Sequence, residues 1–572
     1  MKIHLVCIED GLENVGFRKL SGYVRSINPD TKAAYVPTGN IYSIINIMRE
    51  EGAGTLRDED INAVGKFLGE SDIAGICSMT QYSALSKKII AATKRFNPRT
   101  YIIWGGIHAI IHPEDAIKHV DAVCTGEGEF AFKTFLNSYE NGKDFTTTPS
   151  FWFRKDDKII KNANLPLMSP KQMDELPNLM YQDGELIYRR GKGFGKIKAS
   201  DYLNYNGLQY ATIWSVGCPL MCTYCGNSKF IEYDNGYRRV RHSSPQTIID
   251  EIKRAKIKQP YLSTVIFSDD SFMALPYKVI EEFSKLYKEQ IKIPFVVGGV
   301  IPNYVREDKI ALLVDAGMNR VRMGIQSGSE NILKFYKRPT KLHRIKEATE
   351  ILGKFRKYMI PPAYDIILEN PVESKDDTRA TVDMIYKMPR PFTLNLYALR
   401  VIPNTIMAQD VKDRGLKVPP IDKSYYIDYH RTIGNIIVFA LTFWKFPKWL
   451  YKILRAKIYP VQEKQKTYPI LFWLTRMTYL VTRAYSHVRF MDFSLLPGKV
   501  GYVLWKFGII RFWQRFMLAR FDLSKFIKKN KFQNTQDTVA SSSYIEDTPA
   551  VSSPYIQNTS APSSGKKDLE LN

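Results

Sequence analysis

Three of the six cysteines lie within eight consecutive residues, in the sequence GCPLMCTYCG. Cys218, Cys222 and Cys225 directly follow an apolar stretch at residues 211–216. Three thiolates on one tight loop can take three corners of a cubane iron–sulfur cluster and leave the fourth iron open to a small molecule. A structural zinc site would need a fourth ligand, and the nearby candidate, His242, has no second cysteine or histidine beside it.

The composition indicates the cell compartment in which such a cluster could form. Six cysteines in 572 residues are too few for a disulfide scaffold, and their clustering favours metal ligation in a reducing compartment. The first apolar stretch, residues 3–8, lacks the basic and long apolar regions of a secretory signal, so we expect a cytoplasmic protein. The net charge of +24 predicts a surface that attracts phosphates, lipid headgroups or nucleic acid.

Short apolar stretches alternate with helical segments in the first part of the chain. They predict strands at residues 3–8, 33–36, 73–80, 101–106 and 122–129. Apolar strands separated by helices are typical of a parallel sheet covered on both faces. Residues 1–140 are therefore predicted to form a Rossmann-like (flavodoxin-like) α/β domain.

A second series of strand–helix units follows farther along the chain. Its six predicted strands lie at residues 211–216, 264–270, 295–300, 320–326, 363–369 and 393–402. Six such units indicate a partial (β/α)6 barrel of TIM type, whose chemistry should lie in the loops after the strands. The predicted boundaries are a polar connector at 141–204, the barrel at 205–405, a helical region at 406–531 and a disordered tail at 532–572.

Placed at the start of such a barrel, the cysteine motif resembles the signature of the radical S-adenosylmethionine (SAM) superfamily. Tyr224 supplies the aromatic residue that precedes the last cysteine in that family. The resemblance covers residues 205–405 and implies a [4Fe-4S] cluster whose open iron binds the amino and carboxylate groups of SAM. In the family, an electron from the cluster cleaves SAM to a 5′-deoxyadenosyl radical, and Tyr224 would lie against the adenine.

Further residues resemble family positions that hold SAM. Asp269 and Asp270 follow the second barrel strand, where the family has an acidic segment for the amino group of methionine, although its glycines are missing here. Gln326, followed by Ser327, ends the fourth strand, where the resemblance implies a hydrogen bond to the ribose. Arg338 stands where some members bind the methionine carboxylate, while a solvated helix charge remains an equal alternative.

Three loops at strand ends of the first domain could approach a large cofactor, because glycines there allow close contact with the backbone. The residues are Ser78, Met79 and Thr80; Gly105 and Gly106; and Gly126, Glu127 and Gly128. The arrangement resembles the cobalamin-binding domain that precedes the barrel in one branch of radical SAM enzymes. The loop after the first strand, residues 9–16, contains no histidine, so cobalamin would bind without a protein imidazole at cobalt. The alternative is a vestigial domain that no longer binds cobalamin.

Residues 431–531 are basic and aromatic. They hold twenty Lys and Arg against three acids, Glu463, Asp492 and Asp522. The longest uncharged run there, residues 432–444, has 13 residues, fewer than the ~20 that cross a bilayer. Cations alternating with aromatic residues suit amphipathic helices at an anionic membrane surface, and a helical cap on the barrel is an equal alternative. Nucleic acid is less expected, since no known nucleic-acid module is present.

Two adjacent domains with cofactor loops at their strand ends predict a cobalamin-dependent radical SAM enzyme. In the first hypothesis it methylates an unactivated carbon of a hydrophobic or anionic small molecule, such as a lipid, with electrons from a flavodoxin or ferredoxin. A second hypothesis keeps both cofactors but performs a cyclisation or another oxidoreduction without methyl transfer. A third is a cobalamin sensor or accessory protein with an inert barrel.

Overall fold

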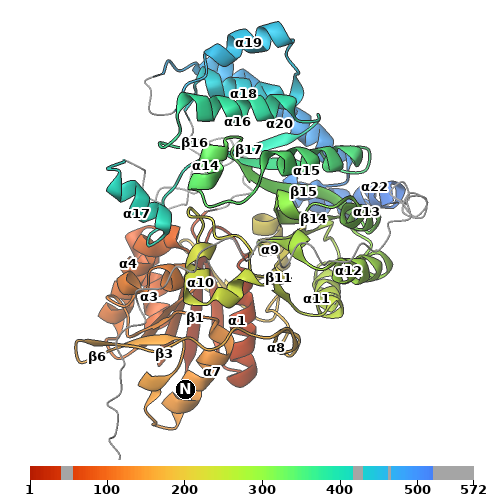
Figure 1. Cartoon of the computed structure of the whole chain (residues 1–572). Helices are drawn as coiled ribbons and strands as arrows, with labels where there is room; N and C mark the ends of the chain where they lie inside the picture. The colour runs from red at the N-terminus through yellow and green to blue at the C-terminus, as the bar shows by residue number, and fades with distance from the viewer. Residues whose placement is uncertain (40–55, 417–429, 461–464, 519–572) are drawn as a thin grey trace, which may run out of the picture. The chain divides into compact units, whose positions relative to one another are not determined.

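The computed structural model describes residues 1–39, 56–416, 430–460 and 465–518. These residues carry two large sheets with helices on their faces, followed by a group of C-terminal helices (Figure 1). The predicted tail at 532–572 lies outside the described residues.

The amino-terminal sheet is built around five parallel strands in the order β5-β4-β3-β1-β2. They are β1 (Ile3–Glu9), β2 (Lys32–Pro37), β3 (Ile73–Ser78), β4 (Tyr101–Gly105) and β5 (Ala122–Cys124). This is the flavodoxin-like order, as the sequence predicts. Because the order reverses between β1 and β3, the loops after these two strands diverge and leave room at the carboxyl edge of the sheet.

Apolar side chains cover both faces of this sheet. The covering helices include α1 (Val15–Ile27), α3 (Asp58–Gly69), α4 (Ser83–Phe96), α5 (Ile107–Ile111), α6 (Pro113–Ala116) and α7 (Gly128–Glu140). Val64 and Leu68 of α3 and Ile89 of α4 are buried with Ile102 and Trp104 of β4 in one cluster. Since each buried aliphatic side chain contributes about 1.5–3 kcal/mol, this cluster fixes the strands whose ends carry the loops.

Residues 141–204, which the sequence predicts to be a connector, contribute four more strands to the same sheet. The hairpin β6 (Phe151–Lys155) and β7 (Lys158–Lys161) pairs antiparallel with β5, and the hairpin β8 (Leu186–Arg189) and β9 (Gly193–Lys196) continues the sheet beyond β2. The sheet therefore has nine strands. These short edge strands carry lysines and arginines between their apolar residues, so the segment is polar in composition although it is paired. Helices α8 (Pro170–Asp174) and α9 (Ala199–Asn206) flank the second hairpin in sequence.

The second sheet has six parallel strands that follow one another in chain order, as predicted for a partial barrel. They are β10 (Gln209–Thr212), β13 (Thr264–Phe267), β14 (Phe295–Val300), β15 (Met318–Gln326), β16 (Ala363–Glu369) and β17 (Thr393–Ala398). The connecting helices include α11 (Pro245–Lys258), α12 (Tyr277–Gln290), α13 (Glu307–Asp315), α14 (Glu330–Phe335), α15 (Leu342–Lys354) and α16 (Lys375–Lys387).

The predicted first strand at 211–216 is divided in the structure. Its first part belongs to β10, whereas β11 (Ser215–Val216) leaves the sheet and pairs antiparallel with β12 (Arg241–His242). The cysteine loop and α10 (Asn227–Tyr233) lie between these two short strands in the sequence.

The described residues of the predicted C-terminal region, 406–531, form mainly helices. Its helices are α17 (Ile406–Asp413), α18 (Ile433–Phe443), α19 (Lys448–Ala456), α20 (Pro469–Arg489), α21 (Gly498–Lys506) and α22 (Ile509–Leu518). Asp492 anchors the region to β15, because its carboxylate lies 2.9 Å from Arg320 Nη1 and 3.2 Å from His487 Nδ1. Among the residues described, none of the helices combines the length and apolar character needed to cross a membrane.

Candidate functional site

The cysteine loop is held tightly against the β11–β12 hairpin. Gly217 has a φ of +118°, and a Cβ there would lie 2.4 Å from the carbonyl oxygen of Arg239. The next residue, Cys218, donates its N–H to the carbonyl oxygen of Tyr237 at 2.9 Å. Only glycine tolerates both the conformation and the close approach, so Gly217 sets the direction in which the loop leaves the strand.

The three predicted cluster ligands converge. Cys218, Cys222 and Cys225 pack in one buried cluster that includes Leu220 and Ile301. Burial raises the pKa of the Cys218 thiol to about 12 and raises that of Cys225, and the neighbouring Cys222 adds to both shifts. Cys222 is buried, and Cys218 and Cys225 are half-buried. Three sulfur donors on one loop are the donor set that an iron–sulfur cluster requires.

A cubane cluster offers each cysteine a separate iron atom, so its ligands need not meet at one point. Within the described ranges, no three His, Cys, Asp or Glu side chains are placed to hold a single metal ion. The cluster at Cys218, Cys222 and Cys225 stays a prediction.

Arg338 lies buried beside the cysteines. Its Nη1 is 3.5 Å from Cys222 Sγ, and its Nη2 donates to the carbonyl oxygen of Gly324 at 2.5 Å. The side chain is only 7 % exposed, and its Nε has no hydrogen-bond partner in the described part of the chain. Arg338 follows the end of α14. Because its side chain is buried, Arg338 is a buried cation whose Nε–H can still donate a hydrogen bond, and it is not a solvated helix charge.

Gln326 lies near Arg338, whereas Ser327 packs against another helix. Gln326 has a φ of +77°, and its Nε2 lies 2.7 Å from the point that a Cβ on Gly324 would occupy, with Arg338 Nη2 at 3.5 Å from the same point. Gly324 thus leaves space for both side chains. Ser327 is fully buried, and its hydroxyl shares a 3.0 Å hydrogen bond with Thr381 of α16.

The two predicted acids have different surroundings. Asp269 is buried and accepts hydrogen bonds from the N–H groups of Trp214 (3.0 Å) and Ser215 (2.7 Å) and from the Ser215 hydroxyl (2.5 Å). It therefore ties the end of β13 to the start of the cysteine loop, and burial raises its pKa to about 7. Asp270 has an exposed side chain that is hydrogen-bonded to Asn227, and its charge raises the pKa of Cys218 and Cys225, so it lies beside the cysteines.

Tyr224 packs edge-to-face on Tyr336 with the ring centroids 4.9 Å apart. The same apolar cluster contains Ile367 of β16 and Leu399, which follows β17. The aromatic residue of the cysteine motif is therefore held next to the ends of the last two barrel strands.

The loop after β3 combines a buried anchor with an unsatisfied hydroxyl. Ser78 is buried, and its Oγ accepts hydrogen bonds from Trp104 Nε1 and Ser86 Oγ, both at 3.0 Å. Thr80 is also buried, but its Oγ1 has no partner among the described residues. Met79, between them, packs against the domain core. A buried hydroxyl without a partner costs free energy, so a ligand group at this edge would satisfy Thr80.

The glycines of the amino-terminal domain lie close to protein atoms. A Cβ on Gly106 would lie 2.9 Å from Cys77 Sγ, and one on Gly126 would lie 2.9 Å from Ser150 Oγ. Gly105 and Gly128 are less crowded, with their nearest neighbours at 3.9 and 3.3 Å. Packing inside the domain therefore explains the glycines at 106 and 126, whereas the contact at 128 is only tight and that at 105 is ordinary.

Glu127 links the first domain to the cysteine hairpin. Its Oε1 lies 2.7 Å from Arg241 Nη2, and its Oε2 accepts the N–H of Met168 at 2.7 Å. Both oxygens are thus engaged by the protein, and Arg241 belongs to β12, which flanks the cysteine loop.

The loop after β4 touches the cysteine loop directly. A Cβ on Gly226, the residue after Cys225, would lie 2.9 Å from Ile111 Cδ1 of α5. Asn404 donates from Nδ2 to the carbonyl oxygen of Ile111 at 3.1 Å. Loops at the carboxyl edges of the two sheets therefore meet next to the cysteines.

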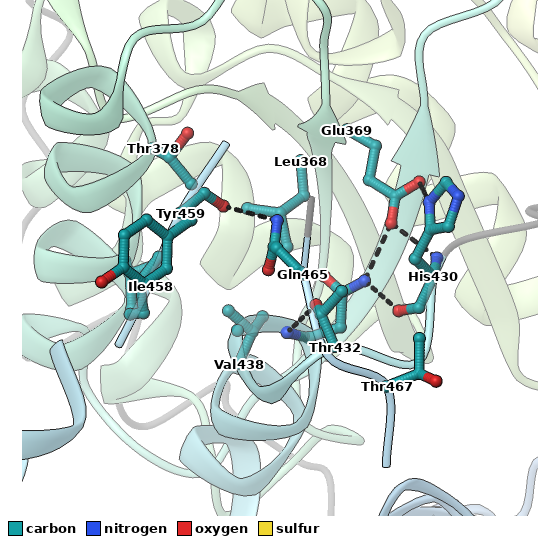
Figure 2. A pocket seen from close by; sticks show the side chains of 13 residues that line it. Leu368, Glu369, Thr378, His430, Thr432, Val438, Ile458, Tyr459, Gln465 and Thr467 are labelled. Atoms are coloured by element: carbon teal, nitrogen blue, oxygen red, sulfur yellow. Dashed lines mark hydrogen bonds and ion pairs between the residues drawn. The ribbon is translucent and has the colours of Figure 1, made fainter. Parts of the chain in front are cut away.

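A cavity of about 260 Å³ lies at the end of β16 (Figure 2). Glu369 Oε1 accepts hydrogen bonds from His430 N at 2.6 Å and Asn435 Nδ2 at 2.9 Å, while Oε2 lies 3.0 Å from His430 Nδ1. The lining also includes Leu368, Thr378, Val382, Thr432, Val438, Ile458, Tyr459, Gln465 and Thr467. Sequence reasoning missed His430 and Asn435, because they follow Glu369 by more than sixty positions and form no motif with it.

The barrel segment that contains the cysteine loop matches a known protein family. Residues 212–385 match the model of the Radical SAM superfamily. A protein of Pyrococcus horikoshii named as an uncharacterized methyltransferase is 22 % identical over 363 residues, which cover 62 % of this chain and 73 % of that protein. The anaerobic magnesium-protoporphyrin IX monomethyl ester cyclase of Synechocystis is 26 % identical over 261 residues, which cover 45 % of this chain and 48 % of the cyclase.

The fold is also found in a solved structure. The cobalamin-dependent S-adenosylmethionine radical enzyme OxsB, solved with aqua-cobalamin and S-adenosylmethionine, matches with a TM-score of 0.55 and 13 % sequence identity. The alignment covers 92 % of this chain and 80 % of OxsB. We conclude that residues 212–385 form a radical SAM domain, set in a chain that shares the fold of a cobalamin-dependent radical SAM enzyme.

Proposed function

We propose that this chain is a cobalamin-dependent radical SAM enzyme that methylates an unactivated carbon of a small hydrophobic or anionic molecule. The observation that carries the proposal is the contact of Ile111 with Gly226 and Asn404. It brings a strand-end loop of the flavodoxin-like sheet against the cysteine loop, so two cofactors at these edges would be neighbours. A reaction that uses both cofactors requires them to lie close together. In such enzymes the cofactors carry out the chemistry and the protein positions them.

In this proposal the cysteines at 218, 222 and 225 hold the [4Fe-4S] cluster. Arg338, with a spare donor and a positive charge, binds the carboxylate of SAM, because a guanidinium pairs strongly with carboxylates. Asp270 suits the ammonium group, and Gln326 suits the ribose hydroxyls. When bound, the cluster and cobalamin would supply the electron that cleaves SAM and the methyl group that is transferred.

Other residues act by positioning. Asp269 and Ser327 fix the backbone of the SAM-binding loops through buried hydrogen bonds. In the first domain Thr80 would meet cobalamin with its hydroxyl, whereas Glu127 holds the domain to the cysteine hairpin. The cavity beside Glu369 lies at the carboxyl end of a barrel strand, where TIM-type barrels bind substrates, and we assign it to part of the substrate.

The proposed setting is a reducing cytoplasm, with a flavodoxin or ferredoxin as electron donor. Six free cysteines without a disulfide in the described residues support it.

A second candidate function keeps both cofactors without methyl transfer. It is favoured by the 26 % identity to the Synechocystis cyclase. Whether the methyl group of SAM reaches the product separates the two candidates.

The test uses the full chain, reconstituted anaerobically with iron, sulfide and hydroxocobalamin, and SAM carrying a ¹³C-labelled methyl group. The protein is incubated with a strong reductant and a small-molecule extract of its host. Both functions predict 5′-deoxyadenosine, and methylation also predicts a labelled product in the extract. 5′-Deoxyadenosine without labelled product would support the second candidate, and absence of both would reject both in favour of a sensor or accessory protein.

A further inference from the structure

The C-terminal helices expose more large hydrophobic side chains than the other described residues together. Nineteen of the twenty-five large hydrophobic side chains that are exposed among the described residues lie between residues 443 and 516. Soluble surfaces rarely gather apolar side chains in this way unless something covers them.

Helix α20 shows the pattern most clearly. Its inner side is fixed by Phe472, Tyr479 and His487, which are buried, and the Tyr479 hydroxyl donates to the carbonyl oxygen of Leu394 at 2.9 Å. Most of its exposed hydrophobic residues are three, four or seven positions apart, which places them along the other side of the helix: Ile470, Leu471, Trp473, Leu474, Val481, Tyr485 and Val488. This spacing makes one continuous apolar stripe that faces away from the protein.

Helix α19 has the same two-sided character. Tyr451 stacks on Tyr386 of α16 with ring centroids 3.8 Å apart, and its hydroxyl donates to Asp383 at 2.6 Å. Trp449, which is 65 % exposed, and Ile453 stand on the free side. The helix is therefore docked by one face, and its other face offers a tryptophan and an isoleucine.

Helices α21 and α22 repeat the arrangement. In α21, Gly501 packs so closely on Leu208 that a Cβ would lie 2.5 Å from Leu208 Cδ1, which fixes the inner side. In α22, Gln514 is buried and donates to the carbonyl oxygen of Ser263 at 3.1 Å. Besides Tyr502, the exposed hydrophobic residues are again three or four positions apart: Val500, Val503 and Phe507, then Ile509, Phe512 and Phe516.

The described residues of the C-terminal helical region carry almost only positive charges. Residues 430–460 and 465–518 contain fourteen Lys and Arg and one acid, Asp492. Asp492 is buried and paired with Arg320, so it does not contribute to the outer surface. Exposed cations stand next to the apolar residues in sequence, with Lys448 and Lys452 around Trp449, and Arg511 and Arg515 around Phe512.

We propose that the exposed faces of α19 to α22 form a membrane-docking surface that lies on a bilayer containing anionic lipids. Apolar stripes that enter the interface and long cationic side chains that reach the headgroups are the features of helices that lie in a membrane plane. Trp and Tyr add the preference for the interface. A protein partner would not require a helical region that is almost without acidic residues. Single-stranded nucleic acid would not require exposed Ile, Leu and Val.

The proposal is independent of the reaction, and vesicle binding tests it. The purified full chain is sedimented with vesicles of phosphatidylcholine alone and of phosphatidylcholine with phosphatidylglycerol, at low and high salt. We expect binding to the anionic vesicles that weakens as salt rises, because each cation near the surface contributes about fivefold in affinity at low ionic strength.

Two triple variants with equal charge change locate the surface. Trp449→Glu, Val481→Glu and Phe512→Glu place one acid on each of three stripes and should weaken vesicle binding by at least about tenfold. The control, Phe96→Glu, Ile159→Glu and Ile257→Glu, alters three exposed hydrophobic residues elsewhere and should bind as the unmodified chain does. Circular dichroism verifies that both variants remain folded.

Equal binding of both triple variants, or no preference for anionic vesicles, would overturn the proposal. So would a dimer, or a complex with single-stranded RNA, that depends on residues 449, 481 and 512 while vesicles are not bound. Either result would assign the surface to a second copy of the chain or to nucleic acid.

Discussion

Arg338 Nη1 lies 3.5 Å from Cys222 Sγ, and the same guanidinium donates to the carbonyl oxygen of Gly324. A buried cation is costly unless it is paired, and here its neighbours are a cysteine and a backbone carbonyl. The arrangement fits a site that is completed by an anionic ligand group.

Replacing Arg338 should weaken SAM binding without loss of the cluster. Arg338→Gln removes the charge and the spare donor, which for a charge-assisted hydrogen bond is worth about 1.5–3 kcal/mol, or roughly ten- to hundredfold in affinity. Isothermal titration of reconstituted protein with SAM measures the loss, and iron analysis verifies the cluster. Lys334→Gln, at an exposed cation on α14, is the control and should change neither. Unchanged SAM affinity in Arg338→Gln would remove Arg338 from the site.

Thr80→Val should weaken cobalamin binding without lowering the stability of the protein. The Thr80 hydroxyl has no partner among the described residues, so its removal should leave the melting temperature of the cofactor-free protein unchanged or slightly raised. Loss of a hydrogen bond to cobalamin should weaken binding by about two- to tenfold, measured by titration with hydroxocobalamin.

Ser78→Ala provides the contrast for Thr80. Its hydroxyl accepts two buried hydrogen bonds, so this change should lower the melting temperature of the cofactor-free protein. If Thr80→Val lowers stability as much and leaves cobalamin affinity unchanged, Thr80 is a packing residue only.

The raised pKa of Asp269 predicts how the stability of the folded chain depends on pH. Its pKa is raised from 3.8 to about 7 in the folded chain, so the folded state binds this proton more tightly than the unfolded state. The resulting contribution to stability is fully present below pH ~4 and is lost as the pH rises through about 7. The melting temperature of the unmodified chain should therefore fall relative to that of Asp269→Asn between pH 5 and pH 8. A constant difference between the two proteins over this range would contradict the assignment.

Much of this site follows from sequence. The cysteine motif and the six apolar strands of the barrel are local patterns, and the structure contains them near the predicted positions. The hairpins β6–β7 and β8–β9 were not predicted, because short charged edge strands resemble a polar linker. The roles of Glu127 and Asp269 also required the structure, since each depends on partners more than fifty positions away.

The contact between Glu369 and His430 is another part of the site that the sequence did not predict. Glu369→Gln keeps one oxygen that can accept from His430 N and Asn435 Nδ2, but it removes the negative charge and replaces the oxygen beside His430 Nδ1 by an NH2 donor. If the cavity holds part of the substrate, we expect KM to rise about tenfold while 5′-deoxyadenosine formation at saturating substrate changes little. Glu350→Gln, at an exposed acid of α15, is the control. An unchanged KM in Glu369→Gln would exclude the cavity from substrate binding.

The central claim is that the three cysteines of the loop hold an iron–sulfur cluster. It is tested most directly by iron and sulfide content and the visible spectrum after anaerobic purification, for the unmodified chain and for Cys218→Ser, Cys222→Ser, Cys225→Ser and the control Cys77→Ser. The account predicts about four irons and four sulfides per chain in the unmodified protein and the control, and near-complete loss in the three loop variants. Zinc in place of iron, or a cluster spectrum that survives serine at any of the three loop positions, would contradict it.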